Sequence, residues 1–247
     1  MIRPLILAIQ FLTRLPGPRL NHITEREIGL SQFYYPLAGL LIGFILIGCA
    51  HFITLQSSAL EAALILTIWV LITGALHIDG LADCADAWVG GYGDREKTLA
   101  IMKDPQSGPV AVTLVICVLL IKYAALEIII SHQAWPGLIL APVVSRSLLP
   151  LLFHTSAYVS PGGLGSALKE QQSVIFNALT QLATLGLVVY LLGLASIILL
   201  LVIFILFIVI RQISLKRLAG ITGDVAGALV ELSEVVVLVT FLSLINQ

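Results

Sequence analysis

Apolar stretches long enough to cross a membrane dominate this chain. A spanning helix needs about 20 predominantly apolar residues, because it rises 1.5 Å per residue through a hydrocarbon core about 30 Å thick. Charged residues make up only 11% of the 247 residues, and the formal net charge is −1. The pattern predicts an all-α, polytopic membrane bundle and excludes a soluble, disordered or nucleic-acid-binding protein. The seven predicted spans are 32–55, 60–77, 108–131, 136–155, 173–192, 195–211 and 225–245.

The fifth and sixth spans form one long apolar run, which we divide near Gly193. No internal repeat is visible, so the sequence predicts a single membrane-embedded domain over 1–247. The first 18 residues are apolar but interrupted by Gln10, Thr13 and Arg14, and they lack a small-residue cleavage site. We therefore expect an N-terminal interfacial or re-entrant helix rather than a signal peptide.

The basic residues are distributed very unevenly between the connections. Of the 13 Lys and Arg residues, eleven lie in the long connections or the N-terminal segment, and none lies in the short connections opposite. Cytoplasmic loops carry the excess of Lys and Arg in membrane proteins. The distribution predicts that the N-terminus, the long connections and the polar chemistry face the cytoplasm, with the C-terminus on the other side.

The sharpest cluster of carboxylates lies in the segment 77–86, HIDGLADCAD, directly after the second span. Asp79, Asp83 and Asp86 are spaced i, i+4 and i+7, so they share one face if the span continues as a helix. Three like charges on one face repel each other, and a hard divalent cation offsets that repulsion. The alternative is a set of solvated aspartates at a helix end, where the helix dipole disfavours them.

A second acidic set lies near the C-terminus. Asp224 and Glu231 are two turns apart on one face, and Glu234 is one turn further. An unpaired charge inside an apolar helix costs at least ~2.5 kcal/mol, so we expect Glu231 to be paired or functional. Either Thr222 or Asp224 can cap the last span, so a plain capping role and a functional role for Asp224 both stay open.

Several cationic side chains accompany these acids. Lys103 and Asp104 end a short amphipathic helix at the mouth of the third span, where Lys103 is placed to meet a phosphate and Asp104 to join a metal site. A solvated helix end explains Lys103 equally well. Arg146 lies mid-helix in the fourth span and needs an anion, either a carboxylate or a substrate phosphate. His77 precedes the aspartate cluster by two residues and is grouped with the phosphate-binding residues.

Two further features carry weaker predictions. Lys122 lies deep in the third span, and we pair it with Glu127 at i+5, although that spacing is poor on a helix. The glycine-rich segment 161–165 is more typical of a hinge or linker than of a phosphate-binding loop.

Carboxylates at the cytoplasmic ends of several membrane helices, with cations nearby, are typical of Mg²⁺-dependent transfer on a diphosphate substrate. The metal neutralises phosphate charge, and a carboxylate accepts the proton of an attacking hydroxyl. The residues indicate this class of reaction and do not name the substrate. The rival interpretation is a transporter that uses buried acids as a cation or proton path, but it predicts acids spread through the membrane depth.

The segment 77–86 resembles the signature of the cobalamin synthase family, also called adenosylcobinamide-GDP ribazoletransferases. Further stretches resemble the family in the same order and cover nearly the whole chain: FLTRLP at 11–16, YYPLAGLLIG at 34–43, IMKDPQSG at 101–108, GGLG at 162–165 and TGDVAGALVELSE at 222–234. The D-G-x-x-A-R pattern of CDP-alcohol phosphotransferases is absent, so only an analogy of chemistry links the chain to those enzymes.

The resemblance implies an Mg²⁺-dependent enzyme of vitamin B12 synthesis in the bacterial inner membrane. Its substrates would be adenosylcobinamide-GDP and α-ribazole or α-ribazole 5′-phosphate, with release of GMP. Association with other corrinoid-assembly enzymes, the oligomeric state and the number of metal ions stay open. The roles that we assign are metal binding for Asp79, Asp83, Asp86 and Asp104, catalysis for Asp79, Asp83, Asp224 and Glu231, and substrate or phosphate binding for Lys103, Arg146 and His77.

Overall fold

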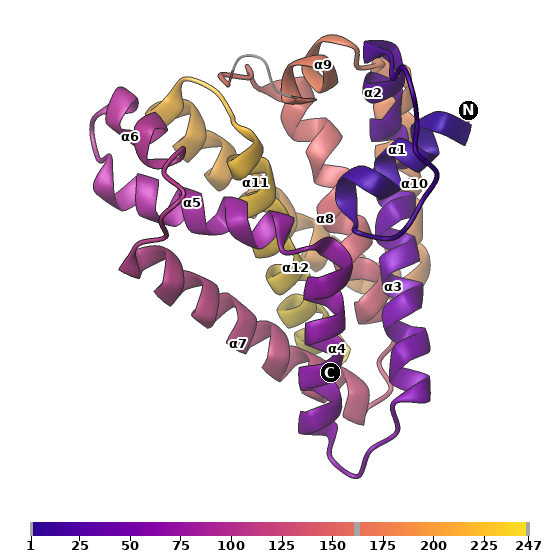
Figure 1. The fold of residues 1–247 in the computed structure, drawn as a ribbon. Helices are drawn as coiled ribbons and strands as arrows, with labels where there is room; N and C mark the ends of the chain where they lie inside the picture. Colours follow the sequence, from indigo (N-terminus) through magenta and orange to yellow (C-terminus); the bar gives the residue numbers. More distant parts are fainter. Residues whose placement is uncertain (1, 161–163, 246–247) are drawn as a thin grey trace.

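The computed structural model describes residues 2–160 and 164–245, and within these ranges the fold is helical without a strand (Figure 1). The all-α prediction is therefore confirmed. Residues 161–163 of the predicted glycine hinge lie outside the described residues. The helices are α1 (Ile2–Leu12), α2 (Glu25–Ser31), α3 (Tyr35–Phe52), α4 (Ser58–Thr73), α5 (Leu76–Gly90), α6 (Arg95–Ile101), α7 (Pro109–Ser131), α8 (Pro136–Thr155), α9 (Leu164–Glu170), α10 (Val174–Leu192), α11 (Ser196–Leu218) and α12 (Gly223–Ile245), with short 3₁₀ turns at Gln32–Tyr34 and Gly193–Ala195.

In the part of the chain that the structure describes, five helical stretches are long and apolar enough to cross a membrane, and a sixth appears if the bent pair α4–α5 counts as one span. One of the five, 174–218, contains 45 residues, more than twice what one crossing needs. It comprises α10 and α11, which meet at Gly193 as predicted. Arg211 near the end of α11 donates to the Thr155 carbonyl at the end of α8, just before α9 and the start of α10. The 45-residue stretch therefore folds back and supplies two crossings.

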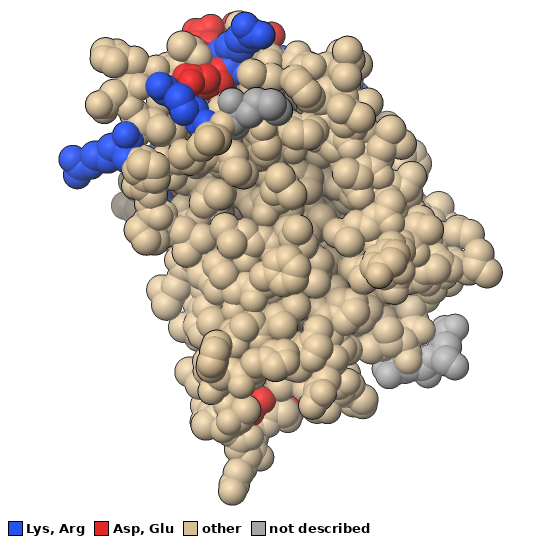
Figure 2. Space-filling view, turned by 90° about the vertical axis from the view of Figure 1, so that its right-hand side faces the viewer, with Lys and Arg blue, Asp and Glu red and all other residues tan. Residues whose placement is uncertain are grey.

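The two ends of the molecule differ in polarity. The connections 53–57 and 132–135 lie at one end of the bundle, whereas α2, α6 and α9 lie at the other (Figure 1). Lys, Arg and acidic side chains gather at that second end on the face seen in Figure 2, and the surface below them is nearly free of charge. This separation matches the asymmetry of Lys and Arg in the sequence, and we call the charged side the polar end.

The predicted second span does not continue through the aspartate cluster. Its helix, α4, ends at Thr73, and α5 begins at Leu76 after a bend of 88°. Gly74 and Ala75 both adopt left-handed backbone conformations, with φ of 63° and 56°, which ends the first helix and redirects the chain. The aspartates therefore lie on a separate helix that runs across the bundle beyond the α4 span, and the condition that the second span continues through them as one helix is not met.

Helices α5 and α12 cross in close contact because glycines face each other at the crossing. A Cβ on Gly80 would lie 2.8 Å from the Asp224 carbonyl oxygen, and a Cβ on Gly227 would lie 3.3 Å from the His77 Cα. Small residues allow membrane helices to approach until their backbones touch. The crossing brings the first turn of α5 against the first turns of α12.

Two other elements close this region. Helix α1 contains 11 residues, too few to span a membrane, and buries Ala8 and Leu12 against the bundle. The segment after α8 pairs with the segment before α12, because Val159 N–H donates to the Ile221 carbonyl and Ile221 N–H donates to the Ala157 carbonyl. These contacts fix the start of α12 beside the end of α8.

We expect Gly80→Ala to destabilise the protein by about 1–3 kcal/mol, because the added methyl meets the backbone of α12, which cannot move independently. Thermal unfolding in detergent measures the change. Gly48→Ala is the matched control, since Gly48 is also inside a helix but a Cβ added there would meet no atom within 4 Å. Equal stability of the two variants would contradict the described crossing.

Candidate functional site

A cavity of about 210 Å³ lies where α1, α5, α8, α9 and α12 meet, at the α5–α12 crossing. Its polar wall consists of His77, Asp79, Tyr158 and Asp224, and the remaining wall is apolar side chains and glycines. Pockets that enclose a drug-sized ligand measure about 300–1,000 Å³. This cavity therefore accommodates a small group or the reacting part of a larger molecule.

The carboxylates of α5 and α12 act on one another across the crossing. Burial has the largest effect on the pKa of Asp83, and together with the charges of Asp79, Asp224 and Asp86, in that order, it raises this pKa to about 6. Asp83 lies on α5, beyond the bend that ends the apolar helix α4. Like charges held together disfavour ionisation, and a cation placed among them reverses that effect. The structure thus brings together Asp79, Asp83 and Asp224, which come from opposite halves of the sequence.

Asp86 shares the helix with this group but is engaged elsewhere. Its Oδ1 accepts a hydrogen bond from Ala111 N–H at 2.9 Å, and its Oδ2 accepts one from Gly108 N–H. These donors belong to the start of α7, whose first N–H groups have no partner within the helix. Asp86 therefore caps α7, a role that its spacing from Asp79 and Asp83 did not reveal.

The alternative capping role for Asp224 is filled by its neighbour. Thr222 Oγ1 accepts a hydrogen bond from Val225 N–H at 3.3 Å and so caps the first turn of α12. The same hydroxyl donates to Asp224 Oδ2 at 3.2 Å. Asp224 is therefore not needed to cap α12, and it lines the cavity wall.

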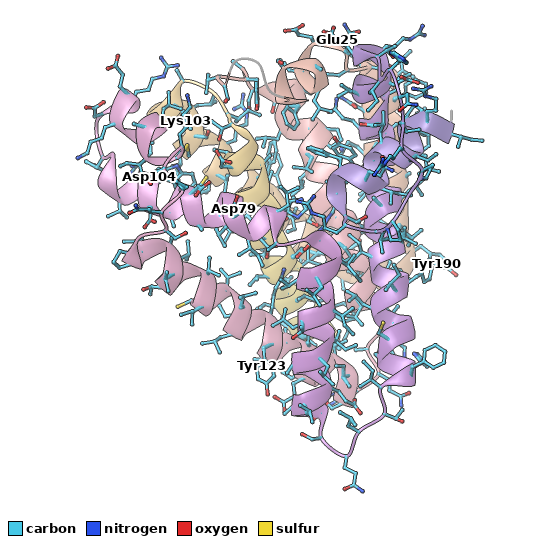
Figure 3. The ribbon with its side chains drawn as sticks, viewed as in Figure 1. Glu25, Asp79, Lys103, Asp104, Tyr123 and Tyr190 are labelled. Carbon is cyan, nitrogen blue, oxygen red and sulfur yellow. The ribbon has the colours of Figure 1, made fainter. Side chains whose placement is uncertain are left out.

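Lys103 and Asp104 lie in the connection between α6 and α7, apart from the cavity (Figure 3). Both are exposed, and Asp104 Oδ1 accepts a hydrogen bond from Gln106 N–H at 3.0 Å within the same connection. Asp104 is not among the carboxylates that act on Asp83. The structure does not bring these two residues to the site, and their predicted roles stay predictions.

A buried network of four charged side chains lies beside the cavity. Lys122 on α7 donates to Glu231 Oε2 at 2.7 Å and also to Glu234, and Arg146 on α8 donates to the other oxygen of Glu234. We call these four residues the buried quartet. All are at most 2% exposed. Two positive and two negative charges balance, which is how ionisable groups persist inside a membrane bundle.

The quartet bears on three predictions made from the sequence, those for Lys122, Glu231 and Arg146. The pairing of Lys122 with Glu127 was wrong, because two glutamates of α12 hold the ammonium, which also lies 4.7 Å from the centroid of the Trp69 ring. Glu231 is paired, as one of the expected alternatives stated, and it does not line the cavity. Two anions were expected as partners of Arg146, a carboxylate or a substrate phosphate. The structure supplies the carboxylate of Glu234. The catalytic role of Glu231 and the phosphate role of Arg146 stay predictions.

His77 connects the cavity with the quartet. It lines the cavity and is 4% exposed, and burial together with the charges of Arg146 and Lys122 holds its pKa well below the ordinary value. The imidazole is therefore neutral at physiological pH. The sequence predicted the aspartate cluster next to His77 but did not predict the quartet.

Tyr158 is a wall residue that sequence reasoning missed. It lies between α8 and α9, with its ring against Gly165 and its hydroxyl near Asp224. Burial raises the pKa of Tyr158, and the charge of Asp224 raises it further, so the phenol stays protonated and can donate a hydrogen bond. No sequence motif marks Tyr158, because its position depends on the backbone pairing of residues 157–159 with Ile221.

Comparisons with known proteins show the family of this chain. The pattern of the cobalamin-5-phosphate synthase family matches residues 4–242. The chain belongs to this family. Relatives named adenosylcobinamide-GDP ribazoletransferase include that of Pseudomonas aeruginosa strain UCBPP-PA14, 50% identical over 96% of this chain and 97% of the relative, and that of Pseudomonas fluorescens strain Pf0-1, 47% identical over the same shares. No solved structure matches the chain.

The family membership makes this chain an enzyme of cobalamin synthesis. The regions that form the cavity and the quartet all lie within the matched residues. The sequence resemblance to the cobalamin synthase family is therefore confirmed over almost the whole chain.

We expect Asp86→Ala to lower the free energy of unfolding by about 0.5–2 kcal/mol, since two N–H groups of α7 lose their acceptor. Asp104→Ala is the control, because its side chain is exposed and caps no long helix. Thermal unfolding in detergent compares the two variants. A stable Asp86→Ala protein would contradict the capping role.

We expect Lys122→Met to destabilise the fold by about 3–5 kcal/mol, because it leaves an unbalanced buried negative charge. The double variant Lys122→Met/Glu231→Gln restores the balance and should recover most of that loss. Denaturation in mixed micelles measures both variants. If the double variant is as unstable as the single one, charge balance is not what holds the quartet.

Proposed function

We propose that the chain transfers the cobinamide-side phosphoryl group of adenosylcobinamide-GDP to a hydroxyl of α-ribazole or α-ribazole 5′-phosphate, and that GMP is the leaving group. The names of the relatives supply the substrate class. The observation that carries the proposal is the convergence of Asp79 and Asp224 in the wall of a cavity at the α5–α12 crossing, with Asp83 close enough for its pKa to respond to both charges. Such a group is suited to a diphosphate only when a cation is present.

Magnesium fits the donor set that this site offers. Among residues 2–160 and 164–245, no three His, Cys, Asp or Glu side chains form a ready cage for a metal ion. Mg²⁺ does not need one, because it commonly uses one or two carboxylates together with waters and substrate phosphates. We assign Asp79 and Asp83 as its ligands, and when bound the ion would neutralise charge on the diphosphate.

The remaining residues have separate tasks in the proposed reaction. The hydroxyl oxygen of α-ribazole forms a bond to the cobinamide-side phosphorus, and the bond from that phosphorus to the bridging oxygen breaks, so that GMP leaves with the electron pair. Asp224 accepts the hydroxyl proton, since Thr222 and not Asp224 caps α12. Tyr158 and His77 line the same cavity and are placed to orient the reacting groups.

We further propose that the polar end faces the cytoplasm of a bacterial inner membrane. The support is the collection of long connections and basic residues at that end, following the positive-inside rule. Water-soluble nucleotides then reach the cavity from the cytoplasm. The single catalytic domain over 1–247 is part of this proposal, because α1 and α12 both contribute to the cavity wall.

The transporter alternative loses its main support in the structure. That alternative relied on buried acids within the spans. Two of these acids, Glu231 and Glu234, are instead paired with Lys122 and Arg146 in a charge-balanced set. A closed set of ion pairs offers no series of free sites across the membrane.

GMP release from liposome-embedded protein supplied with adenosylcobinamide-GDP and α-ribazole 5′-phosphate tests the proposal. We expect turnover that depends on Mg²⁺, stops with excess EDTA, and falls about 10²-fold or more in Asp83→Asn. Glu96→Gln serves as the control, because Glu96 is an exposed acid on α6 outside the cavity. Folded wild-type protein that releases no GMP would reject the function. Full activity of Asp83→Asn would reject the assigned site.

A further inference from the structure

Unpartnered polar atoms lie between the cavity and the buried quartet. Among residues 2–160 and 164–245, His77 Nδ1 is buried without a hydrogen-bond partner, and so are Nε and Nη2 of Arg146. Leaving a buried polar atom unpaired costs about 1–3 kcal/mol, more for a charged group. A native structure is expected to satisfy such atoms, through each other or through a buried water.

The helix faces place Arg146 next to the cavity wall that His77 lines. Arg146 lies on the α8 face that also carries Leu149 and Phe153, two residues of the cavity wall. Arg146 precedes the wall residue Leu149 by three positions. At a rise of 1.5 Å per residue, the two are about 4.5 Å apart along the helix axis. On α12, Gly227 contacts His77, and Glu231 lies one turn beyond it. Both helices lead from the cavity to the quartet.

The chemistry of the two side chains decides the tautomer of the histidine. A guanidinium has five N–H donors and no acceptor, so its free Nε–H and Nη2–H groups can be satisfied only by an acceptor. Arg146 and Lys122, the two cations of the quartet, carry donors only. In a neutral imidazole one nitrogen accepts and the other donates, so an accepting Nδ1 leaves the proton on Nε2.

We propose that His77 donates a hydrogen bond from Nε2 to a non-bridging oxygen of the substrate diphosphate in the cavity. Nδ1 accepts from Arg146, directly or through one buried water, and this contact fixes the tautomer. Arg146 and Glu234 are then positioning residues for His77 and do not contact the substrate. The role of His77 rests on the proposed transferase function, whereas the tautomer rests only on the proposed contact with Arg146.

Two substitutions distinguish the ring nitrogens. The amide of Gln overlays Nε2 of histidine, whereas the amide of Asn overlays Nδ1. We expect His77→Gln to keep GMP release within about tenfold of wild type and His77→Asn to lose about 10²-fold in kcat, as for removal of one preorganised donor. His132→Gln is the control, because His132 is exposed at the opposite end of the bundle. Activity retained by Asn and lost by Gln would overturn the proposal.

The tautomer can be measured without turnover. Nitrogen NMR of protein labelled on its five histidines, with His77→Gln to assign the signal, should show a neutral ring with its proton on Nε2. A proton on Nδ1 would overturn the proposal. If wild-type protein releases no GMP, the proposed function fails, while this spectrum still decides the tautomer.

A charge-balanced double variant tests the positioning role. Arg146→Met/Glu234→Met removes one pair and leaves Lys122 with Glu231, so the fold should persist. We expect a mixture of tautomers at His77 and a lower kcat with an unchanged KM. A merely structural pair would leave both the tautomer and kcat as in wild type, and that result would overturn the role of Arg146.

Discussion

The contact between α5 and α12 at Gly80 and Gly227 is the constraint on which the rest of this structure depends. Asp79 and Asp83 lie more than 130 residues from Asp224 in the chain, and only this crossing unites them. The bend after α4 makes the crossing available, because α5 leaves the direction of the preceding span and turns across the bundle. A straight continuation of α4 would have carried the aspartates away from α12.

Helix α12 contributes residues to both the cavity and the buried quartet. Its first turn carries Asp224 into a cavity, and the face two to three turns further carries Glu231 and Glu234 into the buried quartet. The quartet joins α7, α8 and α12 through paired charges, which fixes the rotation of α12 about its axis more strictly than apolar packing does. The same rotation sets the direction of Asp224, so the buried charges and the cavity are parts of one arrangement.

Sequence reasoning predicted the helical class, the break at Gly193, the aspartates of α5 and the importance of the last span. The spacing of Asp79 and Asp83 and the cost of charge in an apolar helix carry that information locally. It left the cap of α12 open between Thr222 and Asp224. It did not predict that Asp86 caps α7 or that Tyr158 enters the cavity wall. Each of these depends on a contact between distant segments, and the Lys122–Glu127 pairing failed because the true partners are 109 and 112 residues away.

The central claim is that the α5–α12 crossing forms the cation and diphosphate site. Anomalous diffraction from crystals grown with Mn²⁺ in place of Mg²⁺ and with the diphosphate substrate would locate the ion directly. The account predicts a peak at the cavity beside Asp79 and Asp83, within reach of Asp224. An ion bound at Asp104 and away from the crossing, with the substrate in place, would contradict it.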